Sequence, residues 1–131
     1  TCDLDSHYPD VGKPFWVQAG VADRIELRLG PATETVQHLI DGGESGSFDA
    51  VFIDCNKKDY NAYYEAALEL LRVGGIIVVD NIFWNGAVLR ADAQEKSTKA
   101  IRALAHKMHG DERINLAVVP LGDGMTLAVK R

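Results

Sequence analysis

The sequence has little of several features that would place it in a special class of protein. It holds two cysteines among 131 residues, no block of basic residues, and a formal net charge of −5. Cys2 and Cys55 each fall in or at the end of a predicted buried strand, so we expect reduced thiols in a cytoplasmic protein. The acidic balance disfavours a nucleic-acid partner. No apolar run approaches the roughly 20 residues that a membrane span needs, so we expect no membrane partner either.

Two enzyme-like classes are also disfavoured by what is missing. No G-x-G-x-x-G motif occurs, so a nicotinamide dehydrogenase is a weak interpretation. A phosphoacceptor receiver domain has a similar length, but it needs a lysine at the end of a late strand. The segment LAVVPLGDGM, residues 116–125, contains none. The chain is 47% apolar and 25% charged, which is ordinary for one folded domain, so we treat residues 1–131 as a single domain.

What the chain does contain is an alternation of strands and helices. Apolar periodicity predicts strands or strand remnants at residues 2–4, 25–29, 50–54, 76–80, 114–120 and 125–130. The predicted helices cover residues 11–19, 32–40, 60–72 and 94–108. This order favours an α/β fold, with a mostly parallel sheet, helices on both faces and a C-terminal antiparallel hairpin that turns at residues 121–124.

Two consecutive apolar strands end in carboxylates. Asp54 ends FDAVFID, whereas Asp80 ends GGIIVVD and is followed by Asn81. Neighbouring strands lie roughly 4.8 Å apart, and ligands bind at their carboxyl ends, so both acids would reach one ion. Such hard oxygen ligands suit Mg²⁺, Ca²⁺ or Mn²⁺. A lone aspartate at a strand end more often caps a helix or closes a turn, but the three residues together favour a metal site.

Lys57 lies three residues after Asp54 in the same loop. A divalent cation beside it would disfavour its ammonium form, because like charges repel. We therefore predict that Lys57 acts as a general base at neutral pH, and we interpret Lys58 as a surface residue.

With these residues identified, the segment FDAVFIDCNKKDYNAYYEAALELLRVGGIIVVDNIFWNG, residues 48–86, resembles the core of the cation-dependent O-methyltransferases, the caffeoyl-CoA and catechol O-methyltransferase family. The segments TCDLD, VGKPFWVQAGVADRIELRLGPATETV and PLGDGMTLAVKR agree with it, so the resemblance covers essentially the whole chain. It implies a Rossmann-like S-adenosylmethionine-dependent methyltransferase fold. It also implies a divalent cation (Mg, Ca or Mn), a small-molecule phenolic substrate of the catechol or caffeoyl type, and a possible homodimer.

The resemblance assigns roles to single positions. Asp54, Asp80 and Asn81 match the metal ligands, and Lys57 matches the proposed base. The positions that match cofactor contacts are Asp3 at the ribose hydroxyls, Ala32 at the adenine, Tyr63 at the methionine end, and Asp54 and Asn56 beside them. Asn56 replaces an aspartate that helps to hold the cofactor's ammonium group, so we expect weaker cofactor binding. Trp84 is interpreted either as an aromatic wall for a planar substrate or as a core residue.

The beginning of the chain departs from the family pattern. The family's first strand and glycine-rich cofactor loop would precede TCDLD, and that strand normally lies between residues 2–4 and 50–54. Its absence leaves two unpaired inner edges, so we expect a fragment of a longer protein in preference to exchange with a second copy. The isolated chain is then expected to bind a cation weakly and S-adenosylmethionine barely, without useful turnover. The alternative is a non-catalytic methyltransferase-fold interaction module that has lost its cofactor loop.

Overall fold

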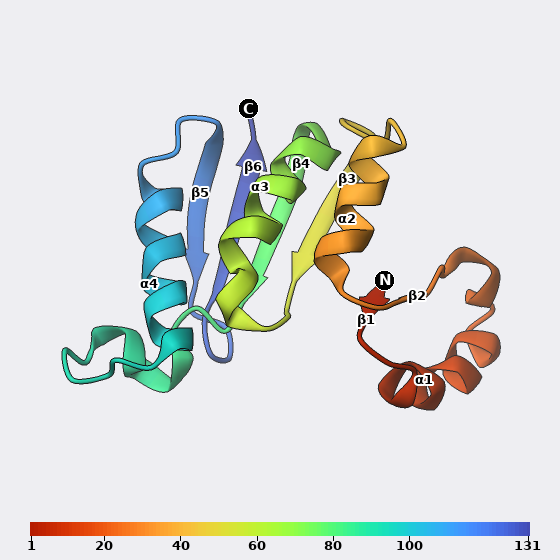
Figure 1. Ribbon diagram of the computed structural model, residues 1–131, viewed down its shortest axis with the longest axis horizontal. Coiled ribbons are helices and arrows are strands. Elements are labelled where there is room, and N and C mark those ends of the chain that lie inside the picture. The colour runs from red at the N-terminus through yellow and green to blue at the C-terminus, as the bar shows by residue number, and fades with distance from the viewer.

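The computed structural model describes residues 1–131, which form an α/β structure with two separate sheets (Figure 1). The strands are β1 (Cys2–Asp3), β2 (Arg28–Leu29), β3 (Phe48–Ile53), β4 (Leu71–Asp80), β5 (Ile114–Val119) and β6 (Met125–Lys130). The α-helices are α1 (His7–Gln18), α2 (Ala32–Asp41), α3 (Tyr60–Leu70) and α4 (Lys96–His109). Short 3₁₀ helices are η1 (Ala22–Arg24), η2 (Lys57–Asp59) and η3 (Trp84–Leu89). None of the helices is both long enough and apolar enough to cross a membrane.

The larger sheet has the strand order β3-β4-β6-β5. β3 and β4 are parallel neighbours, as the sequence predicts, and Ile53 pairs with Val79. The next residues along the two strands, Asp54 and Asp80, therefore emerge at the same edge of the sheet. β6 runs antiparallel to both β4 and β5, which confirms the predicted C-terminal hairpin.

The helices α2, α3 and α4 lie side by side on one face of this sheet (Figure 1). The expectation of helices on both faces is therefore wrong for this chain. Right-handed crossovers that proceed in one direction along a sheet place their helices on the same face. The crossovers from β3 to β4 and from β4 to β5 both proceed in the same direction, so α3 and α4 share a face. On the other face Phe52 leaves 59% of its surface exposed.

The smaller sheet pairs β1 with β2 and is separate from the larger one, and β1 contacts α2 (Figure 1). The predicted strand at residues 25–29 is too long, because β1 offers partners only to Arg28 and Leu29. The predicted burial of Cys2 is also wrong, since it is exposed, whereas Cys55 is half-buried. β1 pairs only with β2, and β3 pairs only with β4, so each has one edge without a strand partner in this chain.

The hydrophobic core lies between the larger sheet and the helices α3 and α4. Alternate residues of β4, Ile77 and Val79, are fully buried on the helix-covered face, as the period-two pattern of a strand requires. The other core residues are Ile53, Tyr60, Tyr64, Ala67, Leu68, Leu71, Ile101, Leu104, Met108, Ile114 and Ala128. Tyr60, at the start of α3, joins this core to the strand ends that carry Asp54 and Asp80.

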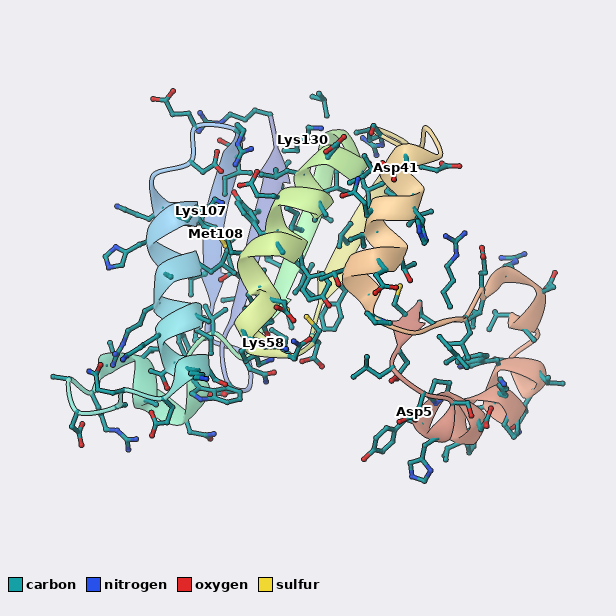
Figure 2. All side chains as sticks on the ribbon, viewed as in Figure 1. Asp5, Asp41, Lys58, Lys107, Met108 and Lys130 are labelled. Carbon is teal, nitrogen blue, oxygen red and sulfur yellow. The ribbon has the colours of Figure 1, made fainter.

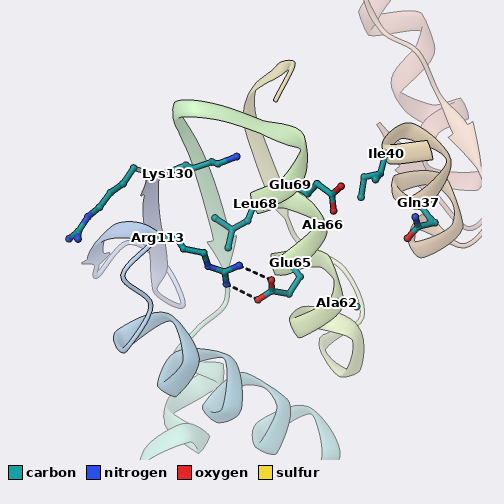
Figure 3. Close-up of a pocket in the computed structure, with 10 residues that line it drawn as sticks. Gln37, Ile40, Ala62, Glu65, Ala66, Leu68, Glu69, Arg113 and Lys130 are labelled. Carbon is teal, nitrogen blue, oxygen red and sulfur yellow. Dashed lines mark hydrogen bonds and ion pairs between the residues drawn. The ribbon is translucent and has the colours of Figure 1, made fainter. Parts of the chain in front are cut away.

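A network of ion pairs joins α3 to α4 and to the start of β5. Figure 3 shows the pair between Glu65 and Arg113. The two terminal nitrogens of Arg113 donate to the two carboxylate oxygens of Glu65, at 2.9 and 3.0 Å. The Nζ atom of Lys107 lies 2.7 Å from the same carboxylate. The hydrogen bonds from Arg113 are the main cause that lowers the pKa of Glu65 to about 2.

We expect the variant Glu65→Gln to be less stable than the parent at pH 7 by about 1 kcal/mol, a figure reduced for the partial exposure of the network. The pKa of Glu65 falls from its ordinary 4.5 to about 2 on folding. The stabilisation is therefore complete above the unfolded value and is lost as the pH falls from 4.5 toward 2. Urea unfolding at pH 7 and pH 3 measures it, with Glu69→Gln on the same helix as the control. A difference between parent and variant that is equal at both pH values would contradict this assignment.

Candidate active site

The ends of β3 and β4 place two candidate site residues around one lysine side chain, at the end of the sheet that Lys58 marks in Figure 2. Lys57 is the first residue of η2, which begins after a short loop from the end of β3 at Ile53. Its Nζ atom lies 3.4 Å from Oδ1 of Asp54 and 3.1 Å from Oδ1 of Asn81. Oxygens contributed by both strand ends therefore converge on a single positive charge.

Lys57 is held in place by more than these two oxygens. Only 8% of its side chain is exposed. Its Nζ atom lies 4.7 Å from the centre of the Tyr60 ring and 5.5 Å from that of the Trp84 ring. Burial of a lone ammonium group is unfavourable, and here acceptor oxygens and aromatic faces offset that cost. The side chain is therefore fixed at the strand ends, unlike its neighbour Lys58, which is 73% exposed.

Tyr60 completes the surroundings of the lysine, and the sequence analysis missed it. The tyrosine is fully buried. Its hydroxyl accepts a hydrogen bond from Nζ of Lys57 and donates one to the backbone carbonyl of Asp80 at 3.0 Å. Burial raises the pKa of Tyr60 far above its usual value of 10, so the hydroxyl keeps its proton for this donation. The three-residue spacing from Lys57 to Tyr60, across one helical turn, was the local signal that could have identified it.

Asn81 turns back toward the lysine through an unusual backbone conformation. Its φ is 56°, in the left-handed region that asparagine tolerates better than most residues. Its backbone N–H donates to Oδ1 of Asp80 at 2.6 Å. The turn allows the amide oxygen of Asn81 to accept from Lys57, 24 positions earlier in the chain.

The chemistry of these donors fits a hard divalent cation. The Oδ1 atoms of Asp54 and Asn81 already contact a positive group, and the carboxylate of Asp80 is adjacent in sequence to Asn81. No group of three or more His, Cys, Asp or Glu side chains in the chain could hold a metal ion. A cation here would thus depend on two carboxylates and an amide, with other oxygens completing its shell. The metal site remains a prediction.

Cys55 lies between these residues in sequence but is no candidate nucleophile. Burial is the main cause that raises the pKa of its thiol to about 11, and the nearby carboxylates of Asp59 and Asp54 act in the same direction. The thiol therefore stays protonated at neutral pH, and the reactive form of cysteine is the thiolate.

The residues predicted to bind the cofactor come from three parts of the chain. The side-chain amide of Asn56 donates to the carboxylate of Asp59, within the loop that holds Lys57. Tyr63 is half-buried. Burial raises the pKa of its hydroxyl, whereas a hydrogen bond with the backbone of Thr33 acts in the opposite direction. Tyr63 therefore lies near the start of α2, where Ala32 is the first residue. Asp3 ends β1 in the separate smaller sheet.

Two cavities lie outside this cluster. One of about 520 Å³ is bordered by the later turns of α3, by α2 and by the end of β6, where Glu65 faces Arg113 (Figure 3). Two of its charged side chains already have partners, because Arg113 donates to Glu65 and Lys130 donates to the carbonyl of Leu71. No buried side-chain nitrogen or oxygen lacks a hydrogen-bond partner, so the cavity offers no such atom to a ligand. The second, of about 190 Å³, is mainly apolar and lies behind Tyr60, between α4 and the hairpin strands.

The fold of this chain is similar to the Rossmann-like fold of solved O-methyltransferases. The O-methyltransferase TomG from Streptomyces achromogenes, solved with S-adenosylmethionine, superposes with a TM-score of 0.88 at 29% identity, over 99% of this chain and 60% of TomG. The chain belongs to the O-methyltransferase family, whose sequence model matches residues 1–131.

Two curated relatives have similar sequences. Catechol O-methyltransferase domain-containing protein 1 of Mus musculus is 40% identical over 130 residues, which are 99% of this chain and 50% of that protein. Probable caffeoyl-CoA O-methyltransferase 2 of Dictyostelium discoideum is 43% identical over 130 residues, 98% of this chain and 56% of that protein. The chain thus spans about half the length of the curated relatives it matches.

Proposed function

We propose that this protein transfers a methyl group from S-adenosylmethionine to one hydroxyl of a vicinal diphenol of the catechol or caffeoyl type, with the help of a divalent cation. The observation that carries the proposal is the convergence of Asp54 and Asn81 on the buried Lys57. The names of the two relatives support the substrate class, and the cofactor bound to TomG supports the methyl donor.

Each residue of the cluster has a distinct role in this proposal. Asp54, Asp80 and Asn81 would hold Mg²⁺, Ca²⁺ or Mn²⁺. When bound, such a cation lowers the pKa of a coordinated hydroxyl, as it does for water. Lys57 would take the phenolic proton, because its Nζ atom lies among the oxygens that would hold the cation. The phenolate oxygen then forms a bond to the methyl carbon as the carbon–sulfur bond of the sulfonium breaks, which releases a neutral thioether.

The cofactor would contact the other predicted residues. Asp3 is proposed for the ribose hydroxyls, Ala32 for the adenine, and Tyr63 for the methionine end. The NH2 group of Asn56 donates to Asp59, so its amide oxygen can still accept from the cofactor's ammonium group, but it contributes no negative charge and we expect weaker cofactor binding. A homodimer, and the absence of nucleic-acid and membrane partners, remain predictions.

The test compares the 131-residue chain with a hybrid protein of the relatives' length. In the hybrid, the part of the Dictyostelium relative that does not align with this chain is joined to it in natural order. We expect the hybrid to methylate caffeoyl or catechol substrates. The 131-residue chain should bind a cation weakly, bind S-adenosylmethionine barely and show no useful turnover. Robust methyl transfer by that chain alone would contradict this division of roles.

Two controls separate this function from the alternative of a non-catalytic module. A monophenol lacks the second oxygen that the cation would bind, so the hybrid should methylate it far more slowly than the diphenol. Calorimetry with S-adenosylhomocysteine should show binding to the hybrid. Equal rates on both phenols would contradict the diphenol preference, and the absence of a heat signal would favour the interaction module.

A further inference from the structure

The hairpin turn between β5 and β6 holds the segment that follows the candidate metal ligands, and the two lie at the same end of the sheet (Figure 1). The backbone N–H of Ile82 donates to the carbonyl of Gly124 at 3.1 Å, and that of Phe83 donates to the carbonyl of Asp123 at 2.9 Å. The side chain of Asp123 adds a third bond, because its Oδ1 accepts from the backbone N–H of Asn85 at 2.8 Å. The turn therefore acts as a clamp on residues 82–85.

The clamped segment has a backbone conformation that needs such support. Trp84 and Asn85 have φ values of 49° and 50°, in the left-handed region. Asparagine tolerates this region, but for a bulky tryptophan it is an unfavourable outlier. Such strain persists only where surrounding contacts determine the conformation. The bond from Asp123 fixes the peptide unit directly after Trp84.

Close packing on the other side of the turn reinforces the clamp. Gly124 has a φ of +79°, and a Cβ atom built there would lie 2.5 Å from the Phe83 ring. Only glycine allows this approach between the turn and the segment. Asp123 and Gly124 thus hold residues 82–85 through hydrogen bonds and through direct contact.

We propose that Asp123 is a positioning residue, which fixes Trp84 with its ring facing Lys57. The ring centre lies 5.5 Å from Nζ of Lys57, while Asp123 reaches the site only through the segment that it holds. The role that follows for Trp84, as the wall against which a planar phenol binds, rests on the proposed function. The placement of the ring by the Asp123 carboxylate does not depend on that function.

The first experiment needs neither metal nor substrate. The chain has two tryptophans and four tyrosines, so in a Trp16→Phe background the fluorescence and circular dichroism at wavelengths beyond the tyrosine absorption band report on Trp84 alone. Asp123→Ala should cause a loss of near-ultraviolet ellipticity and stronger acrylamide quenching, at unchanged far-ultraviolet signal. Asp123→Asn keeps an acceptor oxygen and should resemble the parent, as should Asp92→Ala, which removes an exposed loop carboxylate. If Asp123→Ala does not fold, Asp123→Ser replaces it in the comparison with the parent. The serine side chain is one atom shorter, so its oxygen does not reach the backbone N–H of Asn85 as Oδ1 of Asp123 does.

The second experiment measures substrate binding in the hybrid protein. Asp123→Ala should raise the KM for the diphenol roughly ten-fold with a smaller change in kcat, and Asp123→Asn should restore it. Unchanged tryptophan signals in Asp123→Ala would overturn the positioning role. Altered tryptophan signals with no methyl transfer in the parent hybrid would instead contradict the proposed function alone.

Discussion

Replacing Lys57 by methionine should lower kcat for methyl transfer by the hybrid protein about 10²- to 10⁴-fold, the usual contribution of a general base. Methionine has a similar length and fills the same buried position, but it cannot accept a proton. Initial rates at saturating S-adenosylmethionine and diphenol measure the effect. Lys58→Met is the matched control, since Lys58 is 73% exposed, and it should keep most of the parent rate.

The same variant separates the role of the lysine from that of the oxygens around it. Lys57 contributes a positive charge 3.4 Å from Asp54 and 3.1 Å from Asn81. Its removal ends the repulsion between that charge and a cation, so Lys57→Met should bind Mn²⁺ at least as tightly as the parent. A variant that loses cation binding along with turnover would show that the lysine supports the site in another way. Turnover within a few-fold of the parent would exclude Lys57 as the base.

Replacing Asp80 by asparagine should weaken cation binding at least roughly 10- to 100-fold. That is the usual loss when a residue that only supports a metal ligand is changed, and Asp80 is proposed as a ligand itself. An asparagine oxygen can still accept the backbone N–H of Asn81, which now donates to Oδ1 of Asp80 at 2.6 Å. The turn is therefore kept while one negative charge is lost. Calorimetric titration of the hybrid protein with Mn²⁺ measures the affinity.

Asp59→Asn is the control for this titration. Asp59 is an acidic residue close to Asp54 in sequence, but it accepts a hydrogen bond from Asn56 and is not a proposed metal ligand. It should keep the Mn²⁺ affinity of the parent within a few-fold. Equal Mn²⁺ affinities of the Asp80→Asn variant and the parent would show that Asp80 does not bind the cation.

The strand ends could be predicted from the sequence because their signals are local. Two strongly apolar segments joined by a single amphipathic helix made β3 and β4 parallel neighbours, and this alone brings Asp54 beside Asp80. The loop between strand and helix then places Lys57 at the same edge. Each of these steps depends on residues within about one supersecondary unit.

The remaining features depend on partners far along the chain. The length of β2 is set by β1, which lies 26 positions away and offers only two partners. Tyr60 shows a helical spacing to Lys57, but its second partner is a carbonyl 20 positions later. The sequence identified residues 121–124 as a hairpin turn, yet the bond from Asn85 to Asp123 spans 38 positions and leaves no local signal. Non-local contacts of this kind follow from packing, not from periodicity.

Metal dependence is tested most directly by the initial rate of diphenol methylation by the hybrid protein, with and without excess chelator. If Asp54, Asp80 and Asn81 hold a catalytic cation, chelation should lower the rate by at least about 100-fold, the scale expected when several kcal/mol of transition-state stabilisation are lost. Adding Mg²⁺ or Mn²⁺ back in excess should restore the rate. A rate that chelator leaves unchanged would contradict the proposed role of the metal.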